Sequence, residues 1–130
     1  MIAYCKPKIL QSTHDLIKIK IPLKRRTKNH LNSMYFGALS VGADFAAGLL
    51  VLNILKKHNS KAKLIFKDFQ ADFTKRAMLD VIFTCNDSKV IENSVLENLK
   101  TKRRVNFKVK VNAFCNNEVI ASFVLTTSIK

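Results

Sequence analysis

A long run of apolar and small residues in the middle of the chain constrains the fold more than any other feature. From Met34 to Leu55 the sequence is almost wholly apolar, with Ala, Leu, Met and Phe prominent. About 22 residues at ~1.5 Å each predict a helix roughly 33 Å long. Ser33 is a candidate N-cap, and Lys56 and Lys57 suit the C-terminal end of a helix dipole. Because its apolar residues occupy every face, we expect this helix to be buried all round.

A membrane-spanning helix would have the same length, since ~20 apolar residues cross a bilayer. Against this stand Asp44, which lies mid-segment, and the polar Ser40 and Asn53. A charged residue at mid-span costs ~3 kcal/mol or more in lipid. Small residues also recur through the first half of the segment and would let a sheet or a ligand approach the backbone. These are Gly37, Ala38, Gly42, Ala43, Ala46, Ala47 and Gly48. We therefore expect no membrane span.

A strand precedes the helical segment. Residues 16–23 alternate, with Ile17, Ile19 and Ile21 on one face and lysines on the other. Alternation with a period of two is typical of a strand that buries one face. The basic stretch 24–28 that follows has no periodicity and is expected to form a loop.

The chain after the helical segment is strand-like almost throughout. Strands are predicted at residues 63–77, 79–85, 105–113 and 119–125. In the first of them, the side chains expected on one face are Ile65, Phe69, Ala71 and Phe73. Residues 88–99 carry apolar side chains at helical spacing, which predicts a short amphipathic helix. Asn116-Asn117 marks a hairpin turn between the last two strands.

This element order predicts the fold. Long strands at hairpin spacing favour an antiparallel sheet. A helix that is apolar on every face needs a strongly curved sheet around it. We therefore predict an α+β hotdog fold, in which a long central apolar helix is wrapped by a curved antiparallel sheet of about five strands. Residues 1–130 suit one domain with its own core.

The charge balance is strongly basic, with 23 Lys and Arg against nine Asp and Glu. Such a chain should attract anions, including nucleic acid, anionic lipid and phosphorylated ligands such as coenzyme A. The abundance of Asn and Ile beside Lys offers another explanation, which is codon bias in AT-rich DNA. Nucleic acid is not the expected partner, because no aromatic platform or recognition helix accompanies the charge.

The three cysteines, Cys5, Cys85 and Cys115, form no CxxC pair. Neither a disulfide framework nor a zinc site has usable spacing, so no metal is expected. The N-terminus has no apolar signal core, so a reduced cytoplasmic protein is expected.

Two segments resemble a known family. Residues 29–39 (NHLNSMYFGAL) and 42–48 (GADFAAG) resemble the motif at the helix start of hotdog thioesterases. The resemblance is strongest to an uncharacterised thioesterase-like branch near the PaaI-type acyl-CoA thioesterases, and residues 67–77 resemble that branch's second strand. It covers most of the chain and implies hydrolysis of an acyl-CoA or acyl-carrier thioester. Coenzyme A would then be part of the substrate, and no separate cofactor is implied.

The resemblance also implies catalytic residues. Gly37 matches the position where a backbone N–H binds the thioester oxygen, and Asp44 matches the carboxylate that activates water or attacks directly. In this family the two elements often come from different subunits, which implies a homodimer or a dimer of dimers. PaaI-type enzymes typically read His-Gly-Gly where this chain reads Tyr35-Phe36-Gly37. Tyr35 is therefore either a replacement hydrogen-bond donor or a packing residue, and Phe36 adds bulk beside the carbonyl site.

Other candidates are weighed against structural roles. Asn29 is predicted to orient water or substrate, or else to shape a turn. His30 is a candidate substrate-binding residue, or else a structural histidine. The basic pairs Lys75-Arg76 and Arg103-Arg104 could hold the phosphates of coenzyme A or the acidic face of an acyl carrier protein. The other interpretation is a charged sheet edge that blocks aggregation.

Two functions remain open. The first is a thioesterase that uses Asp44 with the Gly37 backbone, and the second is a non-catalytic acyl-binding or acyl-carrier-binding hotdog protein. A serine hydrolase lacks its Gly-x-Ser-x-Gly motif and a P-loop is absent. A hotdog dehydratase would need a histidine at the helix start, where this chain has none.

Overall fold

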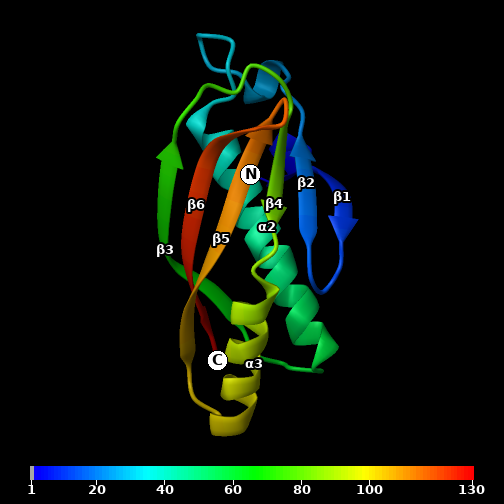
Figure 1. Ribbon diagram of the computed structural model, residues 1–130, viewed down its shortest axis with the longest axis vertical. Coiled ribbons are helices and arrows are strands. Elements are labelled where there is room, and N and C mark those ends of the chain that lie inside the picture. The colour runs from blue at the N-terminus through cyan, green and yellow to red at the C-terminus, as the bar shows by residue number, and fades with distance from the viewer. Residues whose placement is uncertain (1) are drawn as a thin grey trace.

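Six strands form one antiparallel sheet, and the long helix α2 crosses one face of it (Figure 1). The computed structural model describes residues 2–130, so Met1 of the predicted domain lies outside the described residues. The elements are α1 (Ile2–Cys5), β1 (Lys8–Ser12), β2 (Ile17–Ile21), the 3-10 helix η1 (Arg25–Thr27), α2 (Phe36–Lys57), β3 (Leu64–Phe73), β4 (Val81–Cys85), α3 (Ser88–Thr101), β5 (Val105–Cys115) and β6 (Glu118–Ile129). The strand order is β1-β2-β4-β5-β6-β3. This arrangement confirms the predicted α+β hotdog fold.

The sheet follows the alternation of the sequence. Along β5, every second residue from Val105 to Cys115 is buried. Asn116 and Asn117 join β5 to β6 with φ angles of 51° and 63°, the left-handed conformations that a two-residue hairpin turn needs. In α3, Ile91 and Val95 are buried against the rest of the core.

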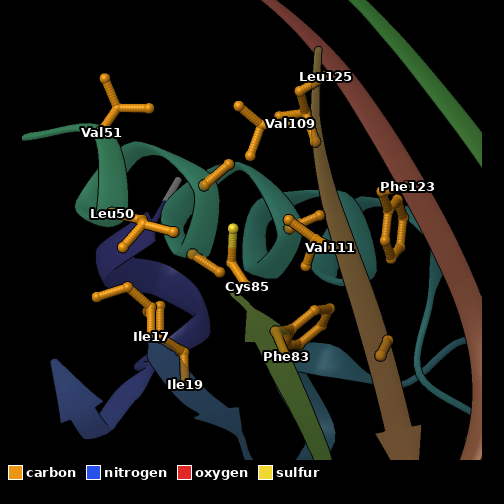
Figure 2. Packing of buried hydrophobic residues seen from close by; sticks show 14 of the residues in the cluster. Ile17, Ile19, Leu50, Val51, Phe83, Cys85, Val109, Val111, Phe123 and Leu125 are labelled. Atoms are coloured by element: carbon orange, nitrogen blue, oxygen red, sulfur yellow. The ribbon is translucent and has the colours of Figure 1, made fainter. Parts of the chain in front are cut away.

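One face of α2 forms the centre of the core. Figure 2 shows Leu50 and Val51 of α2 together with Phe83, Cys85, Val109 and Val111 of the sheet. Gly42 lies so close to Phe83 that a Cβ atom there would sit 2.3 Å from the ring. The small residues of α2 therefore do let the sheet approach the helix, as predicted.

The prediction that α2 is buried all round was wrong for this chain. Five residues at four-residue spacing form a stripe that the sheet covers only in part: Phe36, Ser40, Asp44, Gly48 and Leu52. We call this stripe the open face of α2. Phe36 is 64% exposed and Leu52 is 48% exposed. A sheet in one chain can cover only one side of a helix. The most apolar window of α2 is 61% buried, so α2 is the core helix of the domain.

Several boundaries also differ from the prediction. Helix α2 begins at Phe36, and its N-cap is Tyr35 and not Ser33. Ser33 precedes the N-cap by two residues, and its hydroxyl donates instead to Asn29 Oδ1 in the loop at 3.1 Å.

The predicted facing of the strand after α2 was wrong in part. A β-bulge between Phe66 and Asp68 shifts the register of β3, so Ile65 is 51% exposed and does not share the face of Phe69. The sheet also has a sixth strand, β1. Its five residues are all exposed, so no alternation marked it in the sequence.

Candidate functional site

A shallow cavity at the N-terminal end of α2 collects four of the predicted site residues. Its volume is about 190 Å³. Asn29, Phe36, Lys75 and Arg76 line it, together with Ser33, Met34, Leu39, Phe73 and Ala77. We call it the helix-start cavity. Its walls come from the loop before α2, the first turn of α2 and the segment after β3, so segments far apart in sequence meet here.

The loop before α2 is held by Asn29. Its Oδ1 atom accepts hydrogen bonds from the backbone N–H of Leu31 at 2.9 Å and of Ser33 at 3.2 Å, besides the Ser33 hydroxyl. This turn sets the direction in which the chain enters α2. The side-chain oxygen of Asn29 therefore shapes the loop, which is the structural role considered for it.

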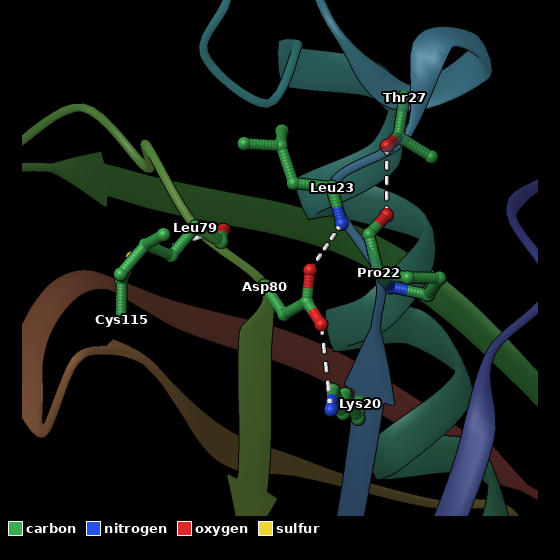
Figure 3. Close-up of polar contacts among 7 residues, drawn as sticks. All are labelled: Lys20, Pro22, Leu23, Thr27, Leu79, Asp80 and Cys115. Carbon is green, nitrogen blue, oxygen red and sulfur yellow. Dashed lines mark hydrogen bonds and ion pairs between the residues drawn. The ribbon is translucent and has the colours of Figure 1, made fainter.

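A polar cluster behind the loop fixes it to the sheet (Figure 3). Asp80 accepts a hydrogen bond from the backbone N–H of Leu23 at 2.7 Å and pairs with Lys20 at 3.3 Å. The Leu23 N–H, followed by Lys20, holds the pKa of Asp80 below its usual value. The Thr27 hydroxyl donates to the Pro22 carbonyl at 2.8 Å. The Asp80 contacts join the end of β2 to the start of β4, and they were not predicted because Leu23 and Asp80 lie 57 residues apart.

Two backbone donors lie free at the start of α2. The N–H groups of Ala38 and Leu39 donate to the Tyr35 carbonyl at 3.1 and 3.2 Å. Within residues 2–130, the N–H groups of Phe36 and Gly37 have no acceptor, and Tyr35 makes no side-chain cap. Such groups carry the positive end of the helix dipole and can bind an oxyanion.

Tyr35 does not line the helix-start cavity. Its ring covers Gly37, where a Cβ atom would lie 2.5 Å from the Tyr35 Cε2 atom. Its hydroxyl lies against the thiol of Cys5, and burial first, then this thiol, raises the pKa of Tyr35. Tyr35 is thus placed as a packing residue, and Gly37 is needed to make room for its ring.

Asp44 is half-buried on the open face of α2. Burial raises the pKa of its carboxyl, and no residue within 2–130 pairs with it. One helical turn earlier, the Ser40 hydroxyl is buried without a hydrogen-bond partner. Residues four apart lie on the same helix face. Asp44 is therefore the polar group on this face that a second chain or a substrate could reach, whereas the Ser40 hydroxyl is already enclosed within the chain.

Aromatic rings form one side of the helix-start cavity. Phe36 packs on Phe73 with ring centroids 5.2 Å apart, and Phe73 packs on the buried Phe123 at 5.7 Å. Phe36 itself stays largely exposed. The three rings give an apolar surface that leads from the cavity towards the core.

The predicted cationic residues do not all gather here. Lys75 is ion-paired with Glu118, while Arg76 lines the cavity beside it. Arg104 donates to Ser128 at the far end of β6. The Lys75 backbone N–H bonds to Ile120 at the near end of β6, so about 26 Å of strand separates the two ends. Arg103 precedes Arg104 in the same loop. His30 is exposed and does not line the cavity.

The burial of the cysteines does not favour a reactive thiol. All three cysteines are buried and free, and burial raises the pKa of Cys85 to about 12. A thiol with that pKa is a poor nucleophile near neutral pH. Across residues 2–130, no group of three or more His, Cys, Asp or Glu side chains could hold a metal ion.

The sequence matches a family model over residues 2–128, and that model describes a domain of unknown function, DUF4442. The chain belongs to the DUF4442 family. No curated protein matches this DUF4442 chain in sequence.

Solved structures share the fold of the DUF4442 chain at low sequence identity. A thioesterase from Haemophilus influenzae is 13% identical with a TM-score of 0.75, over 99% of this chain and 81% of that one. A mutant of a thioesterase enzyme from Staphylococcus aureus is 14% identical with a TM-score of 0.76, over 99% and 97%. A Chlorobaculum tepidum protein of unknown function is 12% identical with a TM-score of 0.87, over 98% and 83%. The resemblance to hotdog thioesterases is thereby confirmed at the level of fold.

Proposed function

We propose that this DUF4442 protein hydrolyses acyl thioesters, with acyl-CoA as the substrate. The observation that supports this best is Asp44, an unpaired carboxylate half-buried on the apolar open face of α2. A carboxylate in such a place costs free energy unless a function or a partner uses it. The free N–H groups of Phe36 and Gly37 supply the second element that thioester hydrolysis needs, a site for the oxyanion.

The two elements of one chain are too far apart to act together. Gly37 and Asp44 are separated by seven residues, or about 11 Å along the helix axis. A base that acts through one water must lie within about 6 Å of the carbonyl carbon. The catalytic pair must therefore come from two copies of the chain.

A symmetric dimer would bring the two elements together. Consider two α2 helices that lie antiparallel across a two-fold axis beside Ser40 and Val41, midway between Gly37 and Asp44. This axis sets Asp44 of each copy level with Gly37 of the other. In this arrangement the two α2 helices overlap over residues 36–45, so the second copy covers the exposed Phe36 and the half-buried Asp44 at the N-terminal part of the open face. A dimer of such dimers is compatible with the same site.

The reaction then follows from the geometry. The thioester oxygen accepts hydrogen bonds from the N–H groups of Phe36 and Gly37, while Asp44 of the other copy takes a proton from water. The water oxygen bonds to the carbonyl carbon, and the N–H groups stabilise the resulting oxyanion. Collapse of this intermediate breaks the C–S bond, and the leaving thiolate takes the proton from Asp44. The raised pKa makes the Asp44 carboxylate a stronger base than an exposed aspartate.

The surroundings of the helix-start cavity suit an acyl chain. Phe36 and Phe73 offer an apolar wall, and Arg76 lies on the same cavity as a cation for polar parts of the substrate. Cavity depth in a dimer depends on both copies, so this wall favours an apolar acyl group without setting its length.

The test is release of free thiol from short, long and aromatic acyl-CoAs. Asp44→Asn should lower turnover at least roughly a hundredfold with fold and oligomer state intact. Asp15→Asn, which changes an exposed carboxylate in the β1–β2 turn, is the matched control and should keep wild-type turnover. Absence of turnover with every acyl-CoA would contradict acyl-CoA hydrolysis.

A non-catalytic acyl-binding role is the second candidate. It is favoured by Tyr35, which packs against Cys5 and does not line the helix-start cavity, and by Phe36, which does line it. On this account an acyl ligand binds at the helix-start cavity, and Asp44→Asn leaves its affinity unchanged. Mass spectrometry of ligand extracted from the purified protein, combined with the thiol-release assay, separates the two functions.

A further inference from the structure

A second and larger cavity lies on the N-terminal side of the fold. Its volume is about 460 Å³, and its walls come from α1, β1 and the segment that contains η1. Five cationic side chains line it: Lys6, Lys8, Lys24, Arg25 and Arg26. We call it the basic cavity. It shares no lining residue with the helix-start cavity.

The charge of the basic cavity is not balanced from within the chain. None of its lining residues is acidic, and no ion pair within residues 2–130 involves any of its five cations. Asp80 feels the charge of Lys24, but its oxygens are already engaged by Leu23 and Lys20. Like charges crowded into a hollow repel one another, and a bound anion would relieve this repulsion.

Tyr4 adds an aromatic surface beside these charges. A neighbouring hollow is lined by Tyr4, Arg25 and Arg26, so it shares its two arginines with the basic cavity. The Arg26 guanidinium lies 5.9 Å from the centre of the Tyr4 ring and donates to the Tyr4 carbonyl at 3.5 Å. Tyr4 is 55% exposed and Arg26 lies over its ring, so a ligand base would stack on the side that Arg26 leaves open. An exposed aromatic ring beside arginines suits stacking of a base.

We infer that the basic cavity binds a nucleotide that carries adjacent phosphates. Arginine and lysine are the side chains that bind phosphate, and five of them around one hollow exceed what a single carboxylate would need. The inference goes beyond the proposed hydrolysis and does not depend on it. The nucleotide could be free in solution or could be the nucleotide portion of coenzyme A, since both present the same phosphates.

The binding of pyrophosphate, ADP and coenzyme A to the intact protein, measured by calorimetry at fixed ionic strength, tests this inference. The double variant Lys8→Gln/Arg25→Gln should weaken ADP binding at least roughly tenfold, which is about 1.4 kcal/mol. Lys108→Gln/Lys110→Gln removes the same charge from the exposed face of β5 and should change affinity less than about twofold. Lys8→Arg/Arg25→Lys keeps the charges and should retain binding.

ADP should bind more tightly than pyrophosphate, because Tyr4 offers its ring to the base. Tighter binding of coenzyme A than of ADP, lost in Lys8→Gln/Arg25→Gln and kept in Lys108→Gln/Lys110→Gln, would identify the coenzyme as the source, and equal binding would indicate a free nucleotide. The inference is overturned if ADP does not bind, or if the two charge-removing variants weaken its binding equally. It is also overturned if a single-stranded oligonucleotide binds more tightly than ADP and loses affinity equally in both variants, because that is a nonspecific nucleic-acid surface. None of these readouts involves thioester turnover, so the inference and the proposed hydrolysis can fail separately.

Discussion

The contact between α2 and the sheet can be tested with two glycines on the same helix. In Gly42→Ala, the new Cβ atom would meet the Phe83 ring at 2.3 Å, and Phe83 is fully buried. In Gly48→Ala, the nearest atoms belong to Phe66 and lie 3.9 Å away, at ordinary contact distance. Both replacements remove a glycine from the interior of α2, and each should gain up to about 1 kcal/mol of helix propensity.

The difference in the free energy of unfolding between the two variants gives the cost of packing a methyl group at position 42 against Phe83. Forcing a methyl group into a well-packed core costs typically 1–3 kcal/mol. We therefore expect Gly48→Ala to be as stable as wild type or more so, and Gly42→Ala to be about 1–3 kcal/mol less stable than Gly48→Ala. Urea unfolding of both proteins, at one protein concentration because Gly48 lies on the open face, measures this difference. If Gly42→Ala is as stable as Gly48→Ala, the close approach of α2 to Phe83 is refuted.

Three further predictions concern the loop, the polar cluster and the site. Asn29→Ala should lower the free energy of unfolding by about 1–2 kcal/mol, because the loop before α2 loses its hydrogen-bond acceptor. Asn29→Asp keeps that oxygen and should be destabilised less. Equal losses of stability for the two variants in urea unfolding would refute the role of Oδ1. Asp80→Ala should cost about 1 kcal/mol at pH 7 through loss of the Leu23 hydrogen bond. Folding lowers the pKa of Asp80, so the ionised carboxylate contributes fully to the free energy of unfolding above the usual pKa of 3.8. That contribution is lost as the pH falls through the lower pKa of the folded state. The stabilities of wild type and Asp80→Ala should therefore converge in strong acid. Since burial raises the pKa of Asp44, thiol release should decline on the acid side at a pH above that of an ordinary aspartate, and the residual activity of Asp44→Asn should lack this limb.

Periodicity and turn residues in the sequence were enough to predict most of the fold. Alternation identified β2, β4, β5 and β6, and the Asn116-Asn117 pair marked the hairpin between the last two strands. Strand β1 could not be predicted, because an exposed edge strand has no buried face and so no alternation. The bulge in β3 depends on pairing with β6, which is a contact distant in sequence.

The candidate site could be predicted only in part. The motif around residues 29–39 and the basic pair after β3 do meet at one cavity. The sequence left Tyr35 either a hydrogen-bond donor or a packing residue, and the choice could not be made because it depends on Cys5 from the N-terminal helix. The burial of α2 was overpredicted for a related reason. An apolar stripe looks the same in sequence whether its own sheet or a second copy covers it.

Complementation between two inactive variants tests most directly whether Asp44 acts on a thioester held by another copy. Tyr35 has φ −76° and ψ 158°, the conformation preferred before proline, so Phe36→Pro fits the first position of α2 and removes its N–H. Phe36→Ala keeps that N–H and is the matched control. Phe36→Pro should be roughly a hundredfold slower than Phe36→Ala, and Asp44→Asn should also be inactive.

The two inactive variants, Phe36→Pro and Asp44→Asn, are then co-expressed with different tags. Half of a random mixture is mixed dimer, and each mixed dimer contains one site with both elements intact. The account predicts recovery of roughly a quarter of wild-type thiol release in the mixture. Activity in the mixture no higher than in either variant alone, with mixed dimers present, would contradict it.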